Sequence, residues 1–423
     1  MRIGIITINS AYNYGCVLQA YALQEYLVKC GHKVDLLNYR PDVIDKVYTL
    51  YREKIKFKTP VLQNTYDKLR RMKQQHERRA TYEKAEKFEK FIKKTLHTGM
   101  VFKSFDEIKE NYDPRDYDLL ITGSDQVWNS DITKGLKPAY FLDFDKVKTE
   151  PGFVRRISYA PSIGVDFLRD SEADFMKKYL ENYDMISVRE QSAAELLSGL
   201  TDKPIKVVSD PTFLLEREDY ESLVERSGFT TPEAYNKKFK GPYILVHVIG
   251  KDRDVVRIAG ALSRRLGLPV IQNRRDKTFD NELGSFASAG PEEFIGLVRG
   301  AKYVVTNSFH ATVFALLYHR NFITVPHKKY PERMVNLLSS LGVEGHLQSK
   351  LGELVGIHED EEFIAASKND KDEMILEKID SMSEDELFKP IDFDEVDARW
   401  AKLREDSQGY LKDALSKVKT LKR

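Results

Sequence analysis

The first 40 residues hold two short apolar segments on either side of one helical segment, and this order restricts the fold more than any other feature. Residues 3–8 are typical of a strand, residues 16–30 predict a helix that stops at Gly31, and residues 33–37 predict a second strand. Two strands joined by one helix lie parallel in a sheet. The chain therefore begins as a parallel α/β sheet.

The alternation of strands and helices continues to about residue 210. Sheet-like segments recur at Tyr117–Thr122, Arg156–Ala160, Met185–Val188 and Ile205–Val208, with helical stretches between them. This pattern predicts a doubly wound, Rossmann-like domain over residues 1–214. A charged stretch at about 48–95 carries an apolar stripe at helical spacing, and we expect a helical insertion that packs on this domain.

A second domain begins at the buried-strand signal Tyr243–Val248. A chain of 423 residues is too long for one ordinary core, which agrees with this division. We predict a polar linker at 215–240, a second Rossmann-like domain at 241–345, and an extension at 346–423. The extension should end in a helix that folds back across the domains.

The composition sets bounds on partners and location. Lys and Arg number 67 against 66 Asp and Glu, so no net charge draws the chain to nucleic acid or to an anionic membrane. No apolar run approaches the roughly 20 residues of a membrane span, and we recognise no signal peptide. We therefore expect a cytoplasmic protein without a membrane span. Cys16 and Cys30 lack metal-binding spacing, and no His or carboxylate cluster predicts a metal site.

A polar turn, Asn13-Tyr14-Gly15, follows the first predicted strand. Open α/β sheets bind ligands at the carboxyl ends of their strands, and the free amides of a helix start favour phosphate or carboxylate. Neither of the glycine-rich dinucleotide or P-loop motifs is present. On spacing alone, a plain turn is favoured over a ligand site.

A second polar loop, Gly123–Asn129, follows the strand signal at 119–122. In one interpretation Asp125 caps a helix and Trp128 packs beneath the loop. In the other, Asp125 and Gln126 hold hydroxyls of an acceptor and Trp128 stacks on a sugar. The spacing favours the helix cap.

A third polar loop, Thr306–His310, follows a strand signal and opens a helix. Ser308 can cap this helix while the helix amides face a phosphate, and His310 could carry a proton at the same place. A histidine packed in the first helical turn is an equally good interpretation.

Two arginines could bind a phosphate or a carboxylate. Arg189 follows a strand signal, and Arg333 lies in the segment Pro331-Glu332-Arg333-Met334. For each arginine, an ordinary ion pair is the alternative. His247 lies inside an apolar strand and should be a core histidine.

The ordered combination of these motifs resembles the polysaccharide pyruvyl transferase family. The motifs are Asn13-Tyr14-Gly15, Gly123–Asn129, Ser158-Tyr159-Ala160, Ser187-Val188-Arg189-Glu190, Asp210-Pro211-Thr212 and Asn307-Ser308-Phe309-His310. The resemblance runs from Met1 to about Leu341 and includes the closing helix. Cys16 departs from the family pattern, in which a small residue such as alanine would be expected.

The resemblance implies two Rossmann-like domains facing a cleft, similar to type B glycosyltransferases. It also implies transfer of pyruvate from phosphoenolpyruvate onto a sugar of a bacterial surface polysaccharide or its precursor, as a ketal, with release of phosphate and no other cofactor. The protein could bind a lipid-linked acceptor at the inner membrane face. The site residues implied are His310 for catalysis; Arg189, Asn307, Ser308, Glu332 and Arg333 for the donor; and Asn13, Tyr14, Gly15, Asp125, Gln126 and Trp128 for the acceptor.

Two other functions stay open at this point. A glycosyltransferase would use a nucleotide sugar in the same cleft and release a nucleotide instead of phosphate. A non-catalytic component of polysaccharide assembly would keep the motifs for folding alone. The mass of the product and the release of phosphate separate the three hypotheses.

Overall fold

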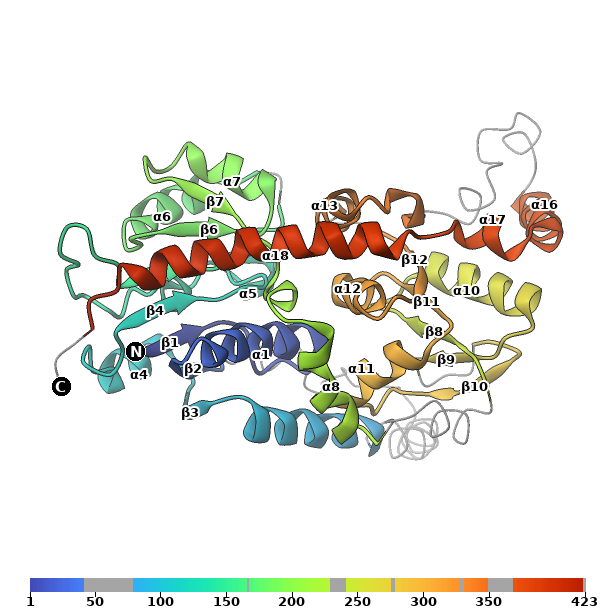
Figure 1. The fold of residues 1–423 in the computed structure, drawn as a ribbon, viewed down its shortest axis with the longest axis horizontal. Coiled ribbons are helices and arrows are strands. Elements are labelled where there is room, and N and C mark those ends of the chain that lie inside the picture. The colour runs from blue at the N-terminus through green and yellow to red at the C-terminus, as the bar shows by residue number, and fades with distance from the viewer. Residues whose placement is uncertain are drawn as a thin grey trace, which may run out of the picture. The chain divides into compact units, whose positions relative to one another are not determined.

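The chain is divided into two units in the computed structural model (Figure 1). Unit 1 comprises Met1–Glu216 and Lys402–Arg423, and unit 2 comprises Arg217–Ala401. The structure describes residues 1–41, 79–165, 167–228, 241–274, 278–326, 331–348 and 368–420.

The start of unit 2 is a helix where the sequence predicted a polar linker. This helix, α8, spans Arg217–Arg226 and packs against α11, which spans Pro291–Gly300. The ring of Tyr220 lies 5.2 Å from that of Phe314 in an edge-to-face contact. Because α8 contributes apolar side chains to unit 2, the linker prediction is wrong for these residues. Residues 229–240 lie outside the described part.

A five-stranded parallel sheet forms the centre of unit 1, with the strand order β3-β2-β1-β4-β5 (Figure 1). All four residues of β4 are buried, as is typical of a parallel strand in a sheet that is covered on both faces. The strands are β1 (Arg2–Ile6), β2 (Lys33–Tyr39), β3 (Thr98–Phe102), β4 (Leu119–Thr122) and β5 (Arg156–Ser158), followed by a separate parallel pair, β6 (Ile186–Val188) and β7 (Ile205–Val207).

The sheet of unit 2 repeats this topology, with the order β10-β9-β8-β11-β12 and all pairs parallel. Its strands are β8 (Ile244–His247), β9 (Val270–Gln272), β10 (Glu282–Ser285), β11 (Tyr303–Thr306) and β12 (Asn321–Thr324). The predicted α/β class with two Rossmann-like sheets is confirmed. The strand order reverses between β1 and β4 in unit 1 and between β8 and β11 in unit 2. Ligands bind at such switch points in open α/β sheets.

Helices connect these strands. In unit 1 they are α1 (Tyr14–Lys29), the helical residues 79–95, α4 (Phe105–Asn111), α5 (Ser130–Thr133), α6 (Asp170–Leu180) and α7 (Gln191–Ser198). In unit 2, α10 (Arg253–Leu266), α12 (Phe309–Leu317), α13 (Glu332–Leu341), α16 (Lys368–Ser381) and α17 (Glu384–Phe388) accompany α8 and α11.

The charged segment predicted at about 48–95 is described only from residue 79 onward. Its described part is helical and buries Phe88, whose ring lies 5.3 Å from that of Tyr14 in α1. Glu89 of the same helix forms an ion pair with Arg40 at 2.9 Å. This helix therefore packs on α1 and leaves its charged face outward.

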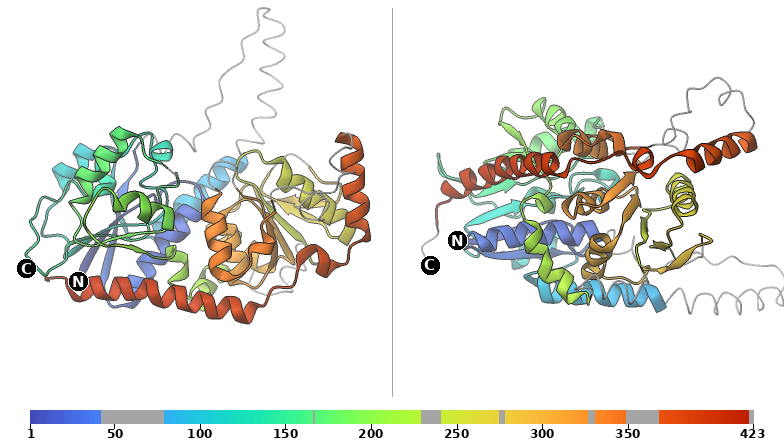
Figure 2. Two further views of the ribbon diagram at one scale, coloured as in Figure 1. Left: turned by 90° about the horizontal axis from the view of Figure 1, so that it is seen from above. Right: turned by 45° about the vertical axis from the view of Figure 1, so that its right-hand side comes forward.

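The predicted closing helix is present as α18, which spans Phe393–Ser416 without a break (Figure 2). Its residues before Lys402 belong to unit 2, and those from Lys402 onward belong to unit 1. In unit 1, the Tyr410 hydroxyl donates to the Ser158 carbonyl at 2.9 Å. Like every other helix that the structure describes, α18 lacks the apolar length needed to cross a bilayer.

Candidate functional site

The loops that follow β1 and β4 lie side by side at the switch point of unit 1. The Thr7 hydroxyl donates to the Ser124 carbonyl at 2.7 Å, which joins the two loops. Gly123 permits this approach, since a Cβ atom there would lie 3.0 Å from the Thr7 Cβ and 3.2 Å from the Ile5 Cγ2. The carboxyl edge of this sheet is therefore closely packed just below its polar loops.

The turn Asn13-Tyr14-Gly15 is occupied by contacts within the protein. Asn13 caps α1, with its Oδ1 accepting from the Gly15 amide at 2.9 Å. Tyr14 is buried, and its ring packs on Phe88. The turn therefore starts and caps α1, and the Tyr14 side chain is used in packing; a contact of this turn with an acceptor stays a prediction.

Asp125 does not cap a helix, contrary to the capping interpretation. Its backbone is left-handed, with φ of 71°, so the chain turns there and the next helix begins only at Ser130. Asn129 caps that helix instead, because its Oδ1 accepts from the Asp131 amide at 2.9 Å. A non-glycine residue held in this region is strained, and such strain clusters at functional sites.

The Asp125 carboxylate lies against a buried thiol. The Cys16 Sγ lies 2.8 Å from the Asp125 Oδ2, to which it donates a hydrogen bond. Burial, followed by the charge of Asp125, raises the pKa of the Cys16 thiol well above its usual value. The thiol therefore stays protonated and neutral beside the carboxylate.

Trp128 belongs to the core of unit 1. The side chain is fully buried, its ring stacks on Phe141 with centroids 5.1 Å apart, and its Nε1 donates to the Tyr140 carbonyl at 3.1 Å. The interpretation in which Trp128 packs beneath the loop is confirmed. Stacking of Trp128 on a sugar is wrong, since no face of the indole is exposed.

Arg189 is the centre of a buried ionic network in unit 1. Its Nη1 lies 2.8 Å from the Asp210 Oδ2, and its Nε lies 3.2 Å from the Glu190 Oε1. Burial alone would lower the pKa of Arg189, but the charges of Glu190, Asp210 and Asp125 raise it above its usual value. The ion-pair alternative is thus present, and Arg189 lies with the residues implied for the acceptor.

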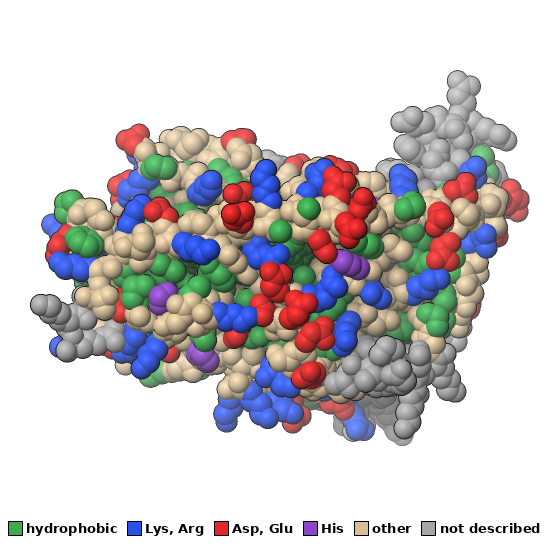
Figure 3. Space-filling view, in the orientation of Figure 1, with side chains coloured by type: hydrophobic (Ala, Val, Ile, Leu, Met, Phe, Trp, Pro, Cys, Tyr) green, Lys and Arg blue, Asp and Glu red, His purple; other side chains and the backbone are tan. Residues whose placement is uncertain are grey.

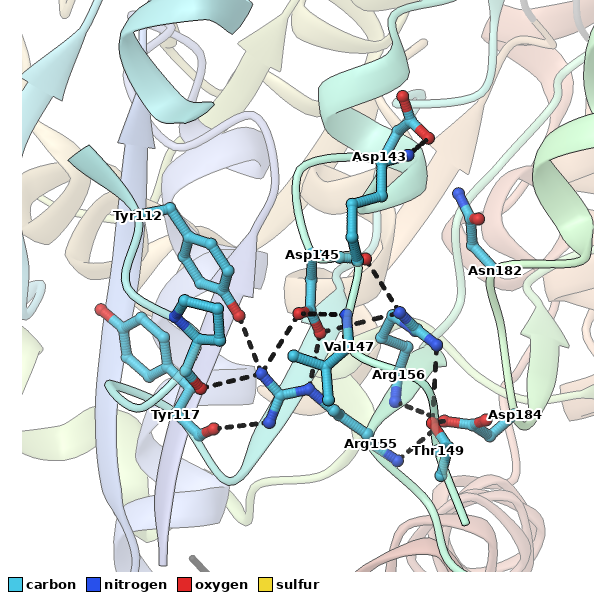
Figure 4. Close-up of polar contacts among 12 residues, drawn as sticks. Tyr112, Tyr117, Asp143, Asp145, Val147, Thr149, Arg155, Arg156, Asn182 and Asp184 are labelled. Atoms are coloured by element: carbon cyan, nitrogen blue, oxygen red, sulfur yellow. Dashed lines mark hydrogen bonds and ion pairs between the residues drawn. The ribbon is translucent and has the colours of Figure 1, made fainter. Parts of the chain in front are cut away.

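A second buried network, which the sequence analysis missed, lies at the opposite edge of the sheet (Figure 4). The Arg155 Nε lies 2.7 Å from the Asp145 Oδ2, and the Asp184 carboxylate accepts from the Arg155 and Arg156 amides, each at 2.8 Å. Arg155 precedes β5, so this network joins the amino ends of the strands. All three nitrogens of the Arg155 guanidinium are bonded within the protein, which indicates a role in stability.

At the switch point of unit 2, Asn307 holds the β8–α10 loop. Its Oδ1 accepts from the Ile249 amide at 2.7 Å, and its Nδ2 donates to the Ile249 carbonyl at 3.1 Å and to the Asp252 Oδ2 at 3.3 Å. Both polar atoms of the buried Asn307 side chain are therefore hydrogen-bonded within the protein. Asn307 thus positions this loop, and its contact with a donor, which the resemblance implied, stays a prediction.

Ser308 and His310 form the start of α12. The Ser308 Oγ accepts from the Ala311 amide at 3.3 Å, so the predicted helix cap is confirmed. His310 is buried in the first turn, with its ring edge-on to Phe309 at 5.2 Å. Glu332 and Arg333, the other residues implied for the donor, begin α13 in the same unit.

A basic cavity of about 300 Å³ lies beside the loop that Asn307 holds. It is lined by Lys251, Asp252, Arg253, Val256, Arg257 and Arg274. The side-chain nitrogens of three of these, Lys251, Arg253 and Arg274, form no ion pair or hydrogen bond with any residue that the structure describes. The sequence analysis missed these cations; Lys251 lies in the loop after β8, Arg253 begins α10, and Arg274 follows β9.

Asp252, the one carboxylate among the described lining residues, has both oxygens hydrogen-bonded within the protein. The Asp252 Oδ1 caps α10, accepting from the Asp254 amide at 3.0 Å and the Val255 amide at 3.4 Å, and its Oδ2 accepts from Asn307. Acidic and basic side chains are interspersed on the face shown in Figure 3. The described lining of the cavity departs from this mixture, because it holds four cationic side chains and one carboxylate, and this excess of positive charge suits an anion.

Comparison with known proteins places the chain in context. The model of the polysaccharide pyruvyl transferase family matches residues 13–329. No curated protein matches the chain.

Among solved structures, the chain is similar to the trehalose-6-phosphate phosphatase N-terminal domain of Candida albicans, with 10% identity, a TM-score of 0.50, and coverage of 98% of this chain and 96% of that chain. It is also similar to the spinosyn forosaminyltransferase SpnP, with 10% identity, a TM-score of 0.46 and coverage of 98% and 99%. The α,α-trehalose-phosphate synthase (UDP-forming) of Burkholderia vietnamiensis gives 10% identity, a TM-score of 0.47 and coverage of 98% and 100%. At this identity the likeness concerns the fold alone.

Proposed function

The chain belongs to the polysaccharide pyruvyl transferase family, and we propose that it transfers a pyruvyl group from phosphoenolpyruvate to a sugar of a surface polysaccharide or its precursor. Two sugar hydroxyls form bonds to the central carbon of the donor, and the bond from that carbon to the phosphate oxygen breaks. Of the two hydroxyl protons, one goes to the methylene carbon of the donor and the other leaves with phosphate. The product is a pyruvate ketal.

The basic cavity of unit 2 is the observation that carries the donor assignment. Phosphoenolpyruvate bears a phosphate and a carboxylate, and Lys251, Arg253 and Arg274 offer cations that no described carboxylate neutralises. Arginine binds both kinds of anion through paired hydrogen bonds. Asn307 connects this cavity to the start of α12 through its bonds to Ile249 and Asp252.

His310 is the proton carrier in this proposal. Histidine is the side chain that enzymes use most often for proton transfer, and the methylene carbon of the donor must receive a proton. Arg333, in the same unit, is assigned to a donor anion, whereas Arg189 is not, because it lies in unit 1 between two carboxylates. The acceptor is assigned to unit 1, where Asp125 and Gln126 follow β4.

The test is an incubation with phosphoenolpyruvate and a panel of methyl glycosides of galactose, glucose and mannosamine, in which product mass and free phosphate are measured together. We expect a pyruvyl adduct and an equal amount of phosphate. Transfer of a hexose from a nucleotide sugar would instead favour the glycosyltransferase hypothesis. No product with any acceptor would favour the non-catalytic one.

The donor site is tested with Arg253→Ala and Arg274→Ala. A charge-assisted hydrogen bond contributes about 1.5–3 kcal/mol, so each variant should raise the KM for phosphoenolpyruvate roughly tenfold or more and leave the acceptor KM unchanged. Arg399→Ala is the control, since Arg399 is exposed and pairs with Glu395 on α18. Wild-type donor KM in both cavity variants would contradict the assignment.

A further inference from the structure

A second cavity adjoins the basic cavity of unit 2. It encloses about 380 Å³ and is lined by residues of α10, of α16 and of the segment that leads into β10. Val256 and Arg257 line both cavities, so the two are neighbours along one face of α10. Sites for small molecules enclose roughly 300–1,000 Å³. Phosphoenolpyruvate is small enough for the basic cavity alone, and the pair of cavities has room for a larger ligand.

The more buried part of the second lining is apolar. Val256 and Leu376 are half-buried there, and Phe279 is buried. Gly260 lies beside them in the middle of α10, where glycine is less favourable than alanine. A Cβ atom on Gly260 would lie 3.7 and 3.8 Å from two carbons of the Phe279 ring, which are ordinary contact distances. Packing therefore does not require glycine here, and its missing side chain leaves the cavity wider.

The exposed part of the second lining is polar. Arg264, Asp280 and Asn281 are exposed, and their side chains form no hydrogen bond or ion pair with any residue in the described part of the chain. A carboxylate accepts hydrogen bonds, whereas a side-chain amide both accepts and donates them. Asp280 and Asn281 can therefore bind the polar edge of a flat group that rests on the apolar residues.

The two cavities differ in the ligand group that they suit. The basic cavity holds four cations and one carboxylate that is bonded within the protein, which suits phosphate. The second cavity combines an apolar surface with Asp280 and Asn281, which suits a heterocyclic base. An alkyl phosphate would match the cations and the apolar surface, but its hydrocarbon chain would leave both of these polar side chains unused. A nucleotide matches both cavities.

We propose that unit 2 binds a nucleoside diphosphate along α10, with its phosphates on Arg253 and Arg274 and its base between Gly260 and Asn281. The nucleotide occupies the cations assigned to the donor, so it competes with phosphoenolpyruvate and inhibits transfer. The competition rests on the proposed function, whereas the binding of the nucleotide does not.

Isothermal titration calorimetry of the full chain with GDP, ADP and UDP, in the absence of phosphoenolpyruvate, tests the binding. Inorganic pyrophosphate and dodecyl phosphate are the comparison ligands. We expect at least one nucleotide to bind tenfold or more tightly than pyrophosphate, because the base adds contacts in the second cavity. Pyrophosphate that binds as tightly as every nucleotide would overturn the proposal. Dodecyl phosphate that binds more tightly than every nucleotide would overturn it in favour of a lipid phosphate.

Gly260→Leu and Gly260→Ala form a matched pair of variants. The leucine side chain fills part of the second cavity, whereas alanine adds only a Cβ atom for which there is room. Both residues favour a helix more than glycine does, so neither variant should lower the melting temperature. Gly260→Leu should raise the Kd of the nucleotide tenfold or more, and Gly260→Ala should leave it within twofold of wild type.

Asn281→Ala provides a second test at an exposed position, where the fold does not depend on the side chain. It should raise the Kd of the nucleotide threefold or more and leave that of pyrophosphate unchanged. Nucleotide affinity like that of wild type in both Gly260→Leu and Asn281→Ala would overturn the proposal.

Inhibition of pyruvyl transfer separates this proposal from the proposed function. The nucleotide should raise the apparent KM for phosphoenolpyruvate and leave kcat unchanged. Gly260→Leu should weaken this inhibition while its own KM for phosphoenolpyruvate stays within twofold of wild type, because Gly260 lines only the second cavity. If the nucleotide binds as expected but no pyruvyl adduct forms, the nucleotide site stands and the proposed reaction fails. If the adduct forms and no nucleotide binds, the reaction stands and the nucleotide site fails.

Discussion

Replacing Arg189 with Met tests whether the network of unit 1 is a buried ionic structure. Arg189 bridges Asp210 and Glu190, and the side chains of all three are at most 4% exposed. The substitution keeps most of the aliphatic volume and removes the charge. It leaves two carboxylates without their shared cation, in a place that water does not reach.

The expected loss of stability is large. Removing one partner of a buried ion pair costs about 3–5 kcal/mol, because the remaining charge stays desolvated. The bonds from the Thr212 amide and hydroxyl to the Asp210 Oδ1, at 3.0 and 2.8 Å, are retained and offset only part of this cost. Against a typical stability of about 5–15 kcal/mol, such a loss would be readily measured.

Urea unfolding followed by fluorescence provides the assay. Trp128 lies in unit 1 and Trp400 in unit 2, so a Trp400→Phe background makes the signal report unit 1. Arg115→Met is the control, since Arg115 pairs with Asp113 on the surface and should barely shift the midpoint. The double variant Arg189→Met/Asp210→Asn should recover part of the loss, because one unpaired charge is also removed.

A decrease of less than about 1 kcal/mol in the free energy of unfolding of Arg189→Met would refute this reasoning, because breaking a buried ion pair should cost more. In that case the carboxylates would be solvated or neutralised in another way. A double variant no more stable than the single variant would show that packing, and not charge, gives Arg189 its importance.

Three further predictions concern His310, Cys16 and Cys30. His310→Gln should reduce turnover by about 10² to 10⁴ with little change in melting temperature, the range for loss of a positioned proton carrier; native turnover would remove His310 from the mechanism. The pKa of the Cys16 thiol in the folded state lies above its usual value of 9.0, so the unfolded state loses this proton at a lower pH than the folded state does. The free energy of unfolding, measured in urea, should therefore fall as pH rises above about 9. Cys16→Ala should lessen this fall; an unchanged pH dependence would contradict the assignment. Ellman's reagent should label the exposed Cys30 at once and Cys16 only on unfolding.

Much of the fold follows from local sequence pattern. The alternation of apolar strands and amphipathic helices predicted both sheets, because burial on two faces requires continuous apolar strands. Asn13 and Ser308 cap their helices, as residues that accept from free helix amides commonly do. The helix α8 was missed because its apolar residues are few among charged ones.

The sites were less predictable than the fold. Asp125 was expected to cap a helix, but its left-handed φ moves the helix start to Ser130, and no local pattern distinguishes Asp125 from Asn129 as the cap. The basic cavity joins Lys251 and Arg274, which are distant in sequence and meet because β8 and β9 are neighbours. Such pairing depends on register, which the sequence pattern leaves open.

The residues that stand out in the sequence motifs differ from the residues whose polar groups have no partner. Asn307, Asn13 and Trp128, which are conspicuous in the motifs, have their polar atoms bonded within the protein and hold loops in place. Lys251 and Gln126, by contrast, carry polar atoms with no bonded partner in the described part of the chain. The unpaired groups of unit 2 are cations, which suit an anionic donor. In unit 1 the unpaired groups include the neutral side-chain amide nitrogens of Gln126 and Asn129, so the two units differ in the charge of the groups that the protein leaves without a partner.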